Sequence, residues 1–275
     1  MLIRIGQFDI TECWDGVFYK KLSQYPQITE WEIQTVLDFI SYEASNGRTC
    51  EIEAEKGIID AIERRRPAYD QGIRIQPPPK IEECTACPGY KGCMTDYVCH
   101  TSPVENAVKI FECGRLLSPV RARKASAARL QKEARNAAND PEDYFEYIMF
   151  AWGNCQAGDR LVMERKLGRF PDEKDLSEGF TPGVRFFFRY EDLVRHPGAV
   201  FEGVLPLKIR DEVVLKDWVS AIIVPEIHRQ QVEQAVPKEL RPRVHFLRND
   251  CKDIWEWSEK VYEYVKKNHM QEMKT

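Results

Sequence analysis

The pattern of apolar and polar residues changes near residue 100 from the two-residue period of a β-strand to the 3.6-residue period of a helix. Residues 96–100 have the pattern of a short β-strand that ends at a histidine. Ser102 then stands where a helix N-cap belongs, and Glu105 completes a capping box. Apolar residues at 104, 107, 108, 110 and 111 give one buried helical stripe, and Gly114 is suited to end the helix. Residues 98–118 therefore predict a strand followed by a well-capped helix.

The first 80 residues have a pattern that favours helices. Thr29 and Glu32 form a second capping box, followed by apolar residues at helical spacing as far as Gly47. Residues 53–65 predict another helix. The three prolines at 77–79 cannot lie inside a helix or a central strand, so they indicate a linker. We expect residues 1–80 to form a mainly helical appendage that ends in this proline-rich linker.

The rest of the chain mixes both periods. Strand patterns occur at residues 184–189, 200–209, 212–215, 219–224 and 243–247, and an apolar, aromatic run at 144–152. Helices are expected at 123–139, 226–236 and 253–268. Because the strands cluster late in the chain rather than alternating with helices, the predicted fold class is α+β.

Composition and charge narrow the class of protein. With 43% hydrophobic and 31% charged residues, the 275-residue chain can bury a normal core. It has neither a long apolar run nor the pattern of a signal peptide, so we expect a cytoplasmic protein without a membrane partner. The net charge of −4 means that nucleic acid would have to bind at a local basic surface.

Four of the nine cysteines are close together and predict a metal site. Cys84, Cys87, Cys93 and Cys99 have the spacing C-x2-C-x5-C-x5-C, with glycine and proline between them. Four thiolates can bind one tetrahedral zinc ion, which is the leading interpretation, and an iron–sulfur cluster is the alternative. Two other interpretations stay open: four cysteines without a ligand, and His100 as a metal ligand.

The segment 120–139 is basic and alanine-rich. It contains six basic residues and a single acidic one, Glu133. A solvent-exposed helix face is the simplest interpretation. One arginine could instead bind a phosphate group through its planar fork of donors, and the others could attract a nucleic-acid backbone.

The segment HTSPVENAVKIFECGRLLS resembles the opening motif of the DarT-type ADP-ribosyltransferases. His100, Asn106, Gly114, Leu116 and Leu117 match that pattern, whereas Ser102 stands where the family usually has threonine. The helix ARLQKEARNAA resembles the segment that follows in the family, and IRDEVVLKDWVSAIIVP and RPRVHFLRND resemble its last segments. The run YFEYIMF corresponds to an aromatic strand but departs from the family's Tyr-Val-Pro-Phe-Tyr-Phe. The resemblance covers residues 97–250.

The resemblance implies a fold and a site. The fold would be a split, mixed β-sheet of the ADP-ribosyltransferase type. Independently of the resemblance, we expect a cysteine-rich metal-site segment at residues 81–99 before it and a C-terminal helix at residues 251–275 after it. Glu212 would be the catalytic carboxylate, and Arg135 would grip NAD, which is the substrate. The remaining predicted contacts to NAD come from His100, Ser102, Asn106, Tyr144 and Tyr147.

The chemistry of NAD cleavage suits these residue types. Breaking the nicotinamide–ribose bond leaves positive charge on the ribose, as in glycoside cleavage, and a carboxylate such as Glu212 can stabilise it. Arg135 could hold the pyrophosphate, His100 could bind a ribose hydroxyl, and Tyr144 or Tyr147 could stack on nicotinamide.

The resemblance also implies partners. DarT-type enzymes modify a base in single-stranded DNA and are toxins with a neutralising antitoxin; RNA, protein or a small molecule could replace the DNA here. A catalytically silent, metal-containing nucleic-acid-binding module is the alternative from another class. An RNA 2′-phosphotransferase ranks lower, because residues 119–122 lack the second histidine that it needs.

Overall fold

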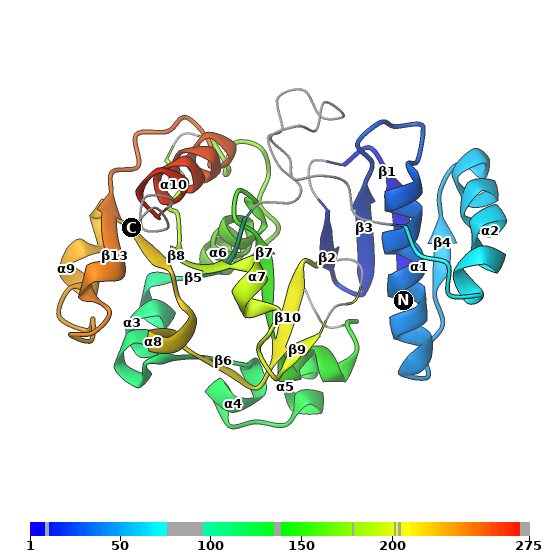
Figure 1. The fold of residues 1–275 in the computed structure, drawn as a ribbon. Coiled ribbons are helices and arrows are strands. Elements are labelled where there is room, and N and C mark those ends of the chain that lie inside the picture. Colours follow the sequence, from blue (N-terminus) through cyan, green and yellow to red (C-terminus); the bar gives the residue numbers. More distant parts are fainter. Residues whose placement is uncertain are drawn as a thin grey trace. The chain divides into compact units, whose positions relative to one another are not determined.

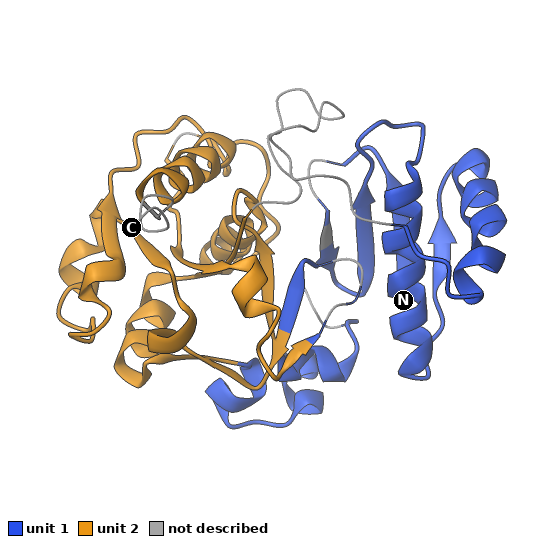
Figure 2. Ribbon diagram, in the orientation of Figure 1, with its two compact units in different colours: residues 1–94, 118–147, 200–208 blue, residues 95–117, 148–199, 209–275 orange. Residues whose placement is uncertain are grey.

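The computed structural model describes residues 1–8, 11–75, 96–134, 139–177, 179–200, 202 and 205–269. The chain divides into two compact units, each assembled from separate stretches of sequence (Figure 2). Unit 1 contains residues 1–94, 118–147 and 200–208, and unit 2 contains residues 95–117, 148–199 and 209–275. This division differs from the expected contiguous domain at 97–250, because two of its stretches fold with the N-terminal region.

Unit 1 is built on a four-stranded sheet with the order β2–β3–β1–β4. The strands are β1 (Leu2–Gly6), β2 (Glu12–Trp14), β3 (Val17–Lys21) and β4 (Glu51–Glu53). Strand β1 is parallel to β3 and β4, and β2 is antiparallel to β3. The N-terminal region was expected to be mainly helical, and this sheet, which accompanies its two helices, was not predicted. These strands have three to five residues, which is too short for a period of two to stand out from the helical pattern.

Two helices pack on this sheet. Helix α1 (Glu30–Ser45) begins with the predicted capping box: the Thr29 hydroxyl accepts from the Glu32 amide, and the Glu32 carboxylate accepts from the Thr29 amide. Helix α2 (Lys56–Asp70) extends beyond the expected 53–65 and includes Pro67. The buried core of the sheet and helices includes Ile3, Phe18, Val36, Phe39, Ile58 and Ile62. The predicted linker prolines at 77–79 lie outside the described residues.

The basic segment forms two short helices in place of the single one expected at 123–139. Helix α4 (Pro119–Arg123) ends at Lys124, which has the left-handed backbone conformation. Helix α5 (Ala127–Glu133) begins after Ser126, whose hydroxyl accepts from the Arg129 amide at 3.3 Å. A serine that can cap a new helix therefore interrupts the pattern. The 3-10 helix η2 (Glu142–Glu146) follows, where a strand was expected to begin.

Unit 2 carries most of a seven-stranded sheet with the order β13–β12–β8–β5–β7–β10–β9 (Figure 1). The bounds are β5 (Tyr97–Ser102), β7 (Tyr147–Trp152), β8 (Val184–Arg189), β9 (Ala199–Val200), β10 (Leu207–Arg210), β12 (Ala221–Pro225) and β13 (Val244–Leu247). Strands β12 and β13 are parallel, whereas β5 is antiparallel to β7 and β8. The mixed sheet confirms the α+β class. Among the described residues of the strand expected at 200–209, the first belongs to β9 and the last few belong to β10.

Helices pack against both faces of this sheet. Phe187 of β8 lies in one core cluster with Met163 of α6 (Ala157–Leu167) and Trp257 of α10 (Ile254–His269). Its neighbour Phe186 points to the opposite face, where its ring lies 5.6 Å from that of Phe111 in α3 (Val104–Cys113). The strand VRFFFR is buried almost throughout because both faces are covered. In the part of the chain that the structure describes, no helix is long and apolar enough to cross a membrane.

The remaining elements of unit 2 are short. A separate antiparallel pair joins β6 (Arg115–Leu117) to β11 (Glu212–Val214). In the described part of unit 2, five short helical elements lie between the strands: α7 (Tyr190–Leu193), α8 (Leu215–Trp218), η3 (Glu226–His228), α9 (Arg229–Val232) and η4 (Arg241–Arg243). The predicted helix at 226–236 is thus shorter than expected, whereas the one expected at 253–268 is confirmed as α10.

Candidate active site

The predicted NAD motif begins inside a central strand rather than at its end. His100 is the fourth residue of β5 and lies opposite Phe186 of β8. Helix α3 then starts at Val104 with Pro103 as the N-cap, and no side chain caps it. The predicted capping box of Ser102 and Glu105 is therefore wrong, because the Ser102 hydroxyl contacts the His100 ring instead. The helix ends as predicted at Gly114, which has a φ of 68°.

The surroundings of His100 determine its charge and its tautomer. Nδ1 lies 3.1 Å from the carbonyl oxygen of Met149, and Nε2 lies 3.2 Å from Oγ of Ser102. Because a carbonyl only accepts, we assign the proton to Nδ1, so Nε2 accepts the Ser102 hydroxyl. Burial lowers the pKa of His100 to about 4, although the Met149 carbonyl opposes this shift. His100 is therefore a neutral imidazole at pH 7.

Backbone packing holds this part of β5 tightly. A Cβ atom on Gly158, near the start of α6, would lie 2.3 Å from Oγ1 of Thr101. A Cβ on Gly183, just before β8, would lie 2.7 Å from Cγ2 of Thr101. Glycine at both positions lets the two backbones reach Thr101. The strand that carries His100 and Ser102 is thus fixed by its neighbours on both sides.

A buried ion pair supports the same strand from the face that His100 does not occupy. Nε of Arg185, opposite Thr101, donates to the Asp159 carboxylate at 2.9 Å, and both side chains are fully buried. Asp159 also accepts from the Gly183 amide at 2.7 Å, and the Arg185 guanidinium donates to the Ser258 hydroxyl. These bonds connect α6, β8 and α10.

Glu212 occupies the first position of β11. It lies opposite Leu117, and its carboxylate accepts from Arg115 at 2.7 Å. The preceding residue, Asp211, has a φ of 68°, which forms the tight turn between β10 and β11. The Glu212 side chain is 26% exposed. The structure thus joins Glu212 to the end of the predicted motif at 100–118, in a pair of strands that neighbours α3.

The other predicted NAD contacts fall in different places. Asn106 is exposed on α3. Arg135 lies outside the described residues. Tyr144 and Tyr147 belong to unit 1, whereas His100, Ser102 and Glu212 belong to unit 2.

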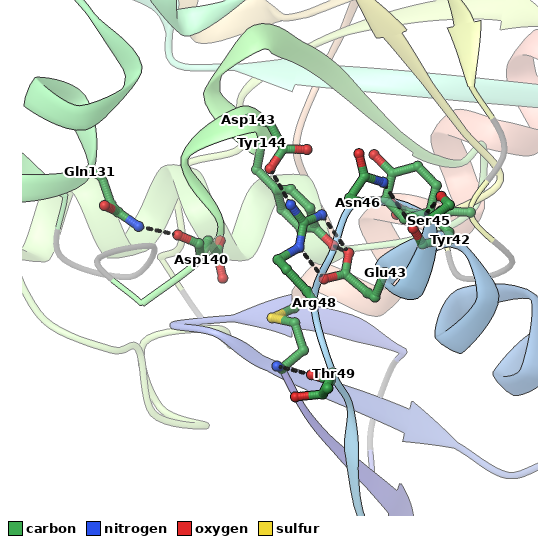
Figure 3. Close-up of polar contacts among 12 residues, drawn as sticks. Tyr42, Glu43, Ser45, Asn46, Arg48, Thr49, Gln131, Asp140, Asp143 and Tyr144 are labelled. Atoms are coloured by element: carbon green, nitrogen blue, oxygen red, sulfur yellow. Dashed lines mark hydrogen bonds and ion pairs between the residues drawn. The ribbon is translucent and has the colours of Figure 1, made fainter.

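Tyr144 is part of the core of unit 1 (Figure 3). It is 2% exposed, and its hydroxyl donates to Oε1 of Glu43 at 2.9 Å. Burial and the nearby carboxylates raise its pKa far above the usual value. Arg48 donates to Glu43 at 2.6 and 3.0 Å and to Asp143 at 2.8 Å, so one arginine joins α1 to η2. These contacts engage Tyr144 inside unit 1, where a stacked nicotinamide has no access to its ring.

Lys208 is the unexpected member of this core. Its ammonium group lies 4.2 Å from the ring centres of Tyr42 and Tyr144 and 4.7 Å from that of Tyr147. Its Nζ is also 2.6 Å from Oε2 of Glu202, with both side chains at most 1% exposed. Sequence reasoning missed this cluster. Lys208 lies between apolar residues in LPLKIR, and a lysine on the buried side of a strand was the available signal.

The predicted metal site cannot be assembled from the described residues. Cys84, Cys87 and Cys93 lie outside them. Cys99 is buried in the core of unit 2, its Sγ lies 3.7 Å from the Trp152 carbonyl, and burial raises its pKa to about 12. Among the residues that the structure describes, no group of three or more histidine, cysteine or acidic side chains could hold a metal ion. Because the structure describes only one of the four cysteines, no step of the function is derived through a metal.

Comparisons with known proteins give no match. No family model matches the chain, and neither a curated protein nor a solved structure matches it.

Proposed function

We propose that this chain is an NAD-dependent ADP-ribosyltransferase with Glu212 as its catalytic carboxylate. The observation that carries the proposal is the pairing of β6 with β11. It sets Glu212 opposite Leu117, the end of the segment that begins at His100, although the two motifs are about a hundred residues apart in sequence. Residues that act in one reaction must lie near one another in the folded protein. The pairing of β6 with β11 links the segment that begins at His100 to the segment that carries Glu212.

Each of the proposed residues has a definite chemical task. The bond between nicotinamide and the ribose carbon breaks, nicotinamide leaves with the bonding electrons, and a nucleophile of the acceptor bonds to that carbon. Glu212 stabilises the positive ribose and takes the proton from the nucleophile. Arg115 donates to the Glu212 carboxylate at 2.7 Å and so holds it in a defined position on β11.

His100 and Ser102 would bind the substrate rather than react with it. A neutral imidazole with its proton on Nδ1 presents Nε2 as an acceptor, now used by the Ser102 hydroxyl. A ribose hydroxyl could replace that contact by donating to Nε2. Asn106 and Arg135 stay in the proposal as contacts implied by the family resemblance, with Arg135 on the pyrophosphate.

The acceptor that we propose is a base in single-stranded DNA, with RNA as the nearest alternative. An unpaired base can be placed beside the ribose carbon without the cost of opening a duplex. Zinc bound by the cysteines at 84, 87, 93 and 99 also remains a proposal. Elemental analysis of protein purified without added metal tests it, because about one zinc atom per chain is expected, whereas a visible iron–sulfur spectrum or no metal contradicts it.

Transfer of label from NAD tests the function. Wild-type protein is incubated with NAD labelled in its adenylate phosphate and with single-stranded DNA, RNA or protein, and free nicotinamide is measured in parallel. We expect Glu212→Gln to abolish transfer, whereas Glu239→Gln, an equal charge change at an exposed position, leaves it intact. If wild-type protein neither labels an acceptor nor releases nicotinamide, the transferase proposal is wrong.

A further inference from the structure

Helices α4 and α5 expose a concentrated basic surface in unit 1. Residues 119–133 contain five basic residues and one acidic residue, in a chain whose net charge is −4. The basic side chains are all exposed: Arg121, Arg123, Lys124, Arg129 and Lys132. Within this segment the large apolar residue Leu130 is 3% exposed and holds α5 to the core. The face directed to solvent is therefore cationic.

The Glu133 carboxylate forms ion pairs with two of these arginines, Arg123 and Arg129. Glu133 lies 2.8 Å from Nε of Arg129 on its own helix and 3.7 Å from a guanidinium nitrogen of Arg123 on α4. A single acid thus holds guanidinium groups from two helices side by side and cancels only one of their two charges. Their side chains are 66% and 70% exposed, so most of their donors face water. Paired guanidinium groups with free donors suit phosphate oxygens.

The corner between the helices carries a lysine in a conformation that favours glycine. Lys124 has a φ of 51° and a ψ of 44°, the left-handed region, and it ends α4. Glycine is the usual residue at such a helix end. Glycine would fit this backbone conformation with less strain, but lysine adds a positive charge between the two helices.

The chemistry of the surface favours a polyanion over a membrane. Among the described residues, the exposed large apolar side chains are Tyr25, Ile73, Phe170, Val194 and Ile227, none of them in α4 or α5. A helix that binds a bilayer needs an exposed apolar face in addition to its charge. Helix η2, which packs against α4 and α5, carries three acidic residues, Glu142, Asp143 and Glu146, and Asp143 is held by Arg48 at 2.8 Å.

We propose that the exposed face of α4 and α5, with Arg123, Arg129 and Lys124 at its centre, binds the phosphate backbone of a single-stranded nucleic acid. The inference deepens the proposed function, on which it rests for the nature of the acceptor. Contacts of this kind position a strand without reading its sequence. They also release counterions, so the affinity should fall steeply with salt.

Binding is measured without NAD, by fluorescence anisotropy of a labelled 20-nucleotide oligo-dT between 50 and 300 mM salt. For four to five phosphate contacts, log affinity should fall with log salt at a slope of about −3. Arg123→Gln with Arg129→Gln should weaken binding about tenfold and make the slope shallower by about 1.4. The matched control, Lys174→Gln with Lys238→Gln, removes two exposed charges elsewhere and should leave the slope unchanged.

Lys124→Gly provides a second variant that does not threaten the fold. It should weaken binding roughly threefold while the urea midpoint does not fall, since glycine accepts the backbone conformation. Equal losses in the test and control doubles, a salt-independent affinity, or binding to anionic phosphatidylserine vesicles but not to the oligonucleotide would overturn the proposal. Binding in the absence of NAD does not require the chemical step, so the two measurements are independent. Intact binding without label transfer would therefore refute the transferase and not this surface.

Discussion

The ammonium group of Lys208 lies 2.6 Å from the Glu202 carboxylate, and both side chains are withdrawn from water. Three tyrosine rings surround the same ammonium group at 4.2 to 4.7 Å. Removing charges from water is costly, and only close partners offset that cost. The pair therefore stabilises the fold only while both of its members are present.

Lys208→Met should accordingly destabilise the protein by about 3–5 kcal/mol, because it leaves the Glu202 charge buried without a partner. Adding Glu202→Gln should recover much of this loss, since the remaining group is neutral. Urea unfolding measures both effects, with Lys174→Met as the control at an exposed lysine. A double variant as unstable as the single one would show that the tyrosine rings, rather than the carboxylate, stabilise the ammonium group.

Acid should weaken the fold through His100. Its pKa in the folded protein is about 4, below the 6.5 of an unperturbed histidine, so the unfolded chain binds the proton more readily. This contribution to the free energy of unfolding is complete above pH 6.5 and is lost as the pH falls towards 4. Unfolding is measured between pH 7.5 and 4.5 for wild type and His100→Gln. The difference between them should shrink as the pH falls; a constant difference would contradict the buried neutral imidazole.

Asp140 should act in the opposite direction. Burial raises the pKa of Asp140 to about 6, although the Gly16 amide, which donates to its Oδ1 at 2.6 Å, opposes this shift. The folded protein therefore holds the proton more tightly than the unfolded chain does. Its stabilising contribution is therefore lost as the pH rises from about 4 to 6. Asp140→Asn keeps an acceptor for Gly16 and should stabilise the protein at pH 7.5 by on the order of 1–3 kcal/mol. The gain should vanish near pH 4, and a gain that persists there would have another cause.

Gly158→Ala tests the packing behind the predicted NAD motif. The new methyl group would lie 2.3 Å from Oγ1 of Thr101, so we expect a loss of about 1–3 kcal/mol. Gly57→Ala is the matched control, because that helical glycine has no atom within 4 Å of the Cβ position. The control should gain about 0.5–1 kcal/mol from the higher helix propensity of alanine. Equal effects in thermal unfolding would mean that α6 can move away from β5.

The predictions that the structure confirms depend on short sequence patterns, such as helix caps and helix stops. The capping box of Thr29 and Glu32 and the stop at Gly114 depend on a few neighbouring residues, so the sequence contains all the information. Ser102 had the same local signal, but its hydroxyl is used by the His100 ring that projects from the same face of β5 two residues before it. The hydrogen bond between two side chains of the same strand therefore replaced the helix cap that the sequence predicts.

Long-range pairings account for most of what could not be predicted. The association of β6 with β11 joins residues about a hundred positions apart, and nothing in either strand specifies the partner. The burial of Lys208 depends on aromatic residues from α1 and from the segment around η2. The basic segment, by contrast, was recognised from composition alone, because exposure leaves its charge pattern visible in the sequence.

The interleaving of the two units has a consequence for synthesis. Residues 1–75 supply most of the sheet and core of unit 1, but the stretches at 118–147 and 200–208 arrive much later on the ribosome. Until Lys208 emerges, the rings of Tyr42, Tyr144 and Tyr147 lack the cation that they surround. A nascent chain that stops before residue 200 would therefore leave unit 1 unfinished. In such a chain we expect proteases to cleave residues 118–147 readily, whereas residues 1–75, which contain all four strands of the unit 1 sheet and its core cluster, should resist cleavage.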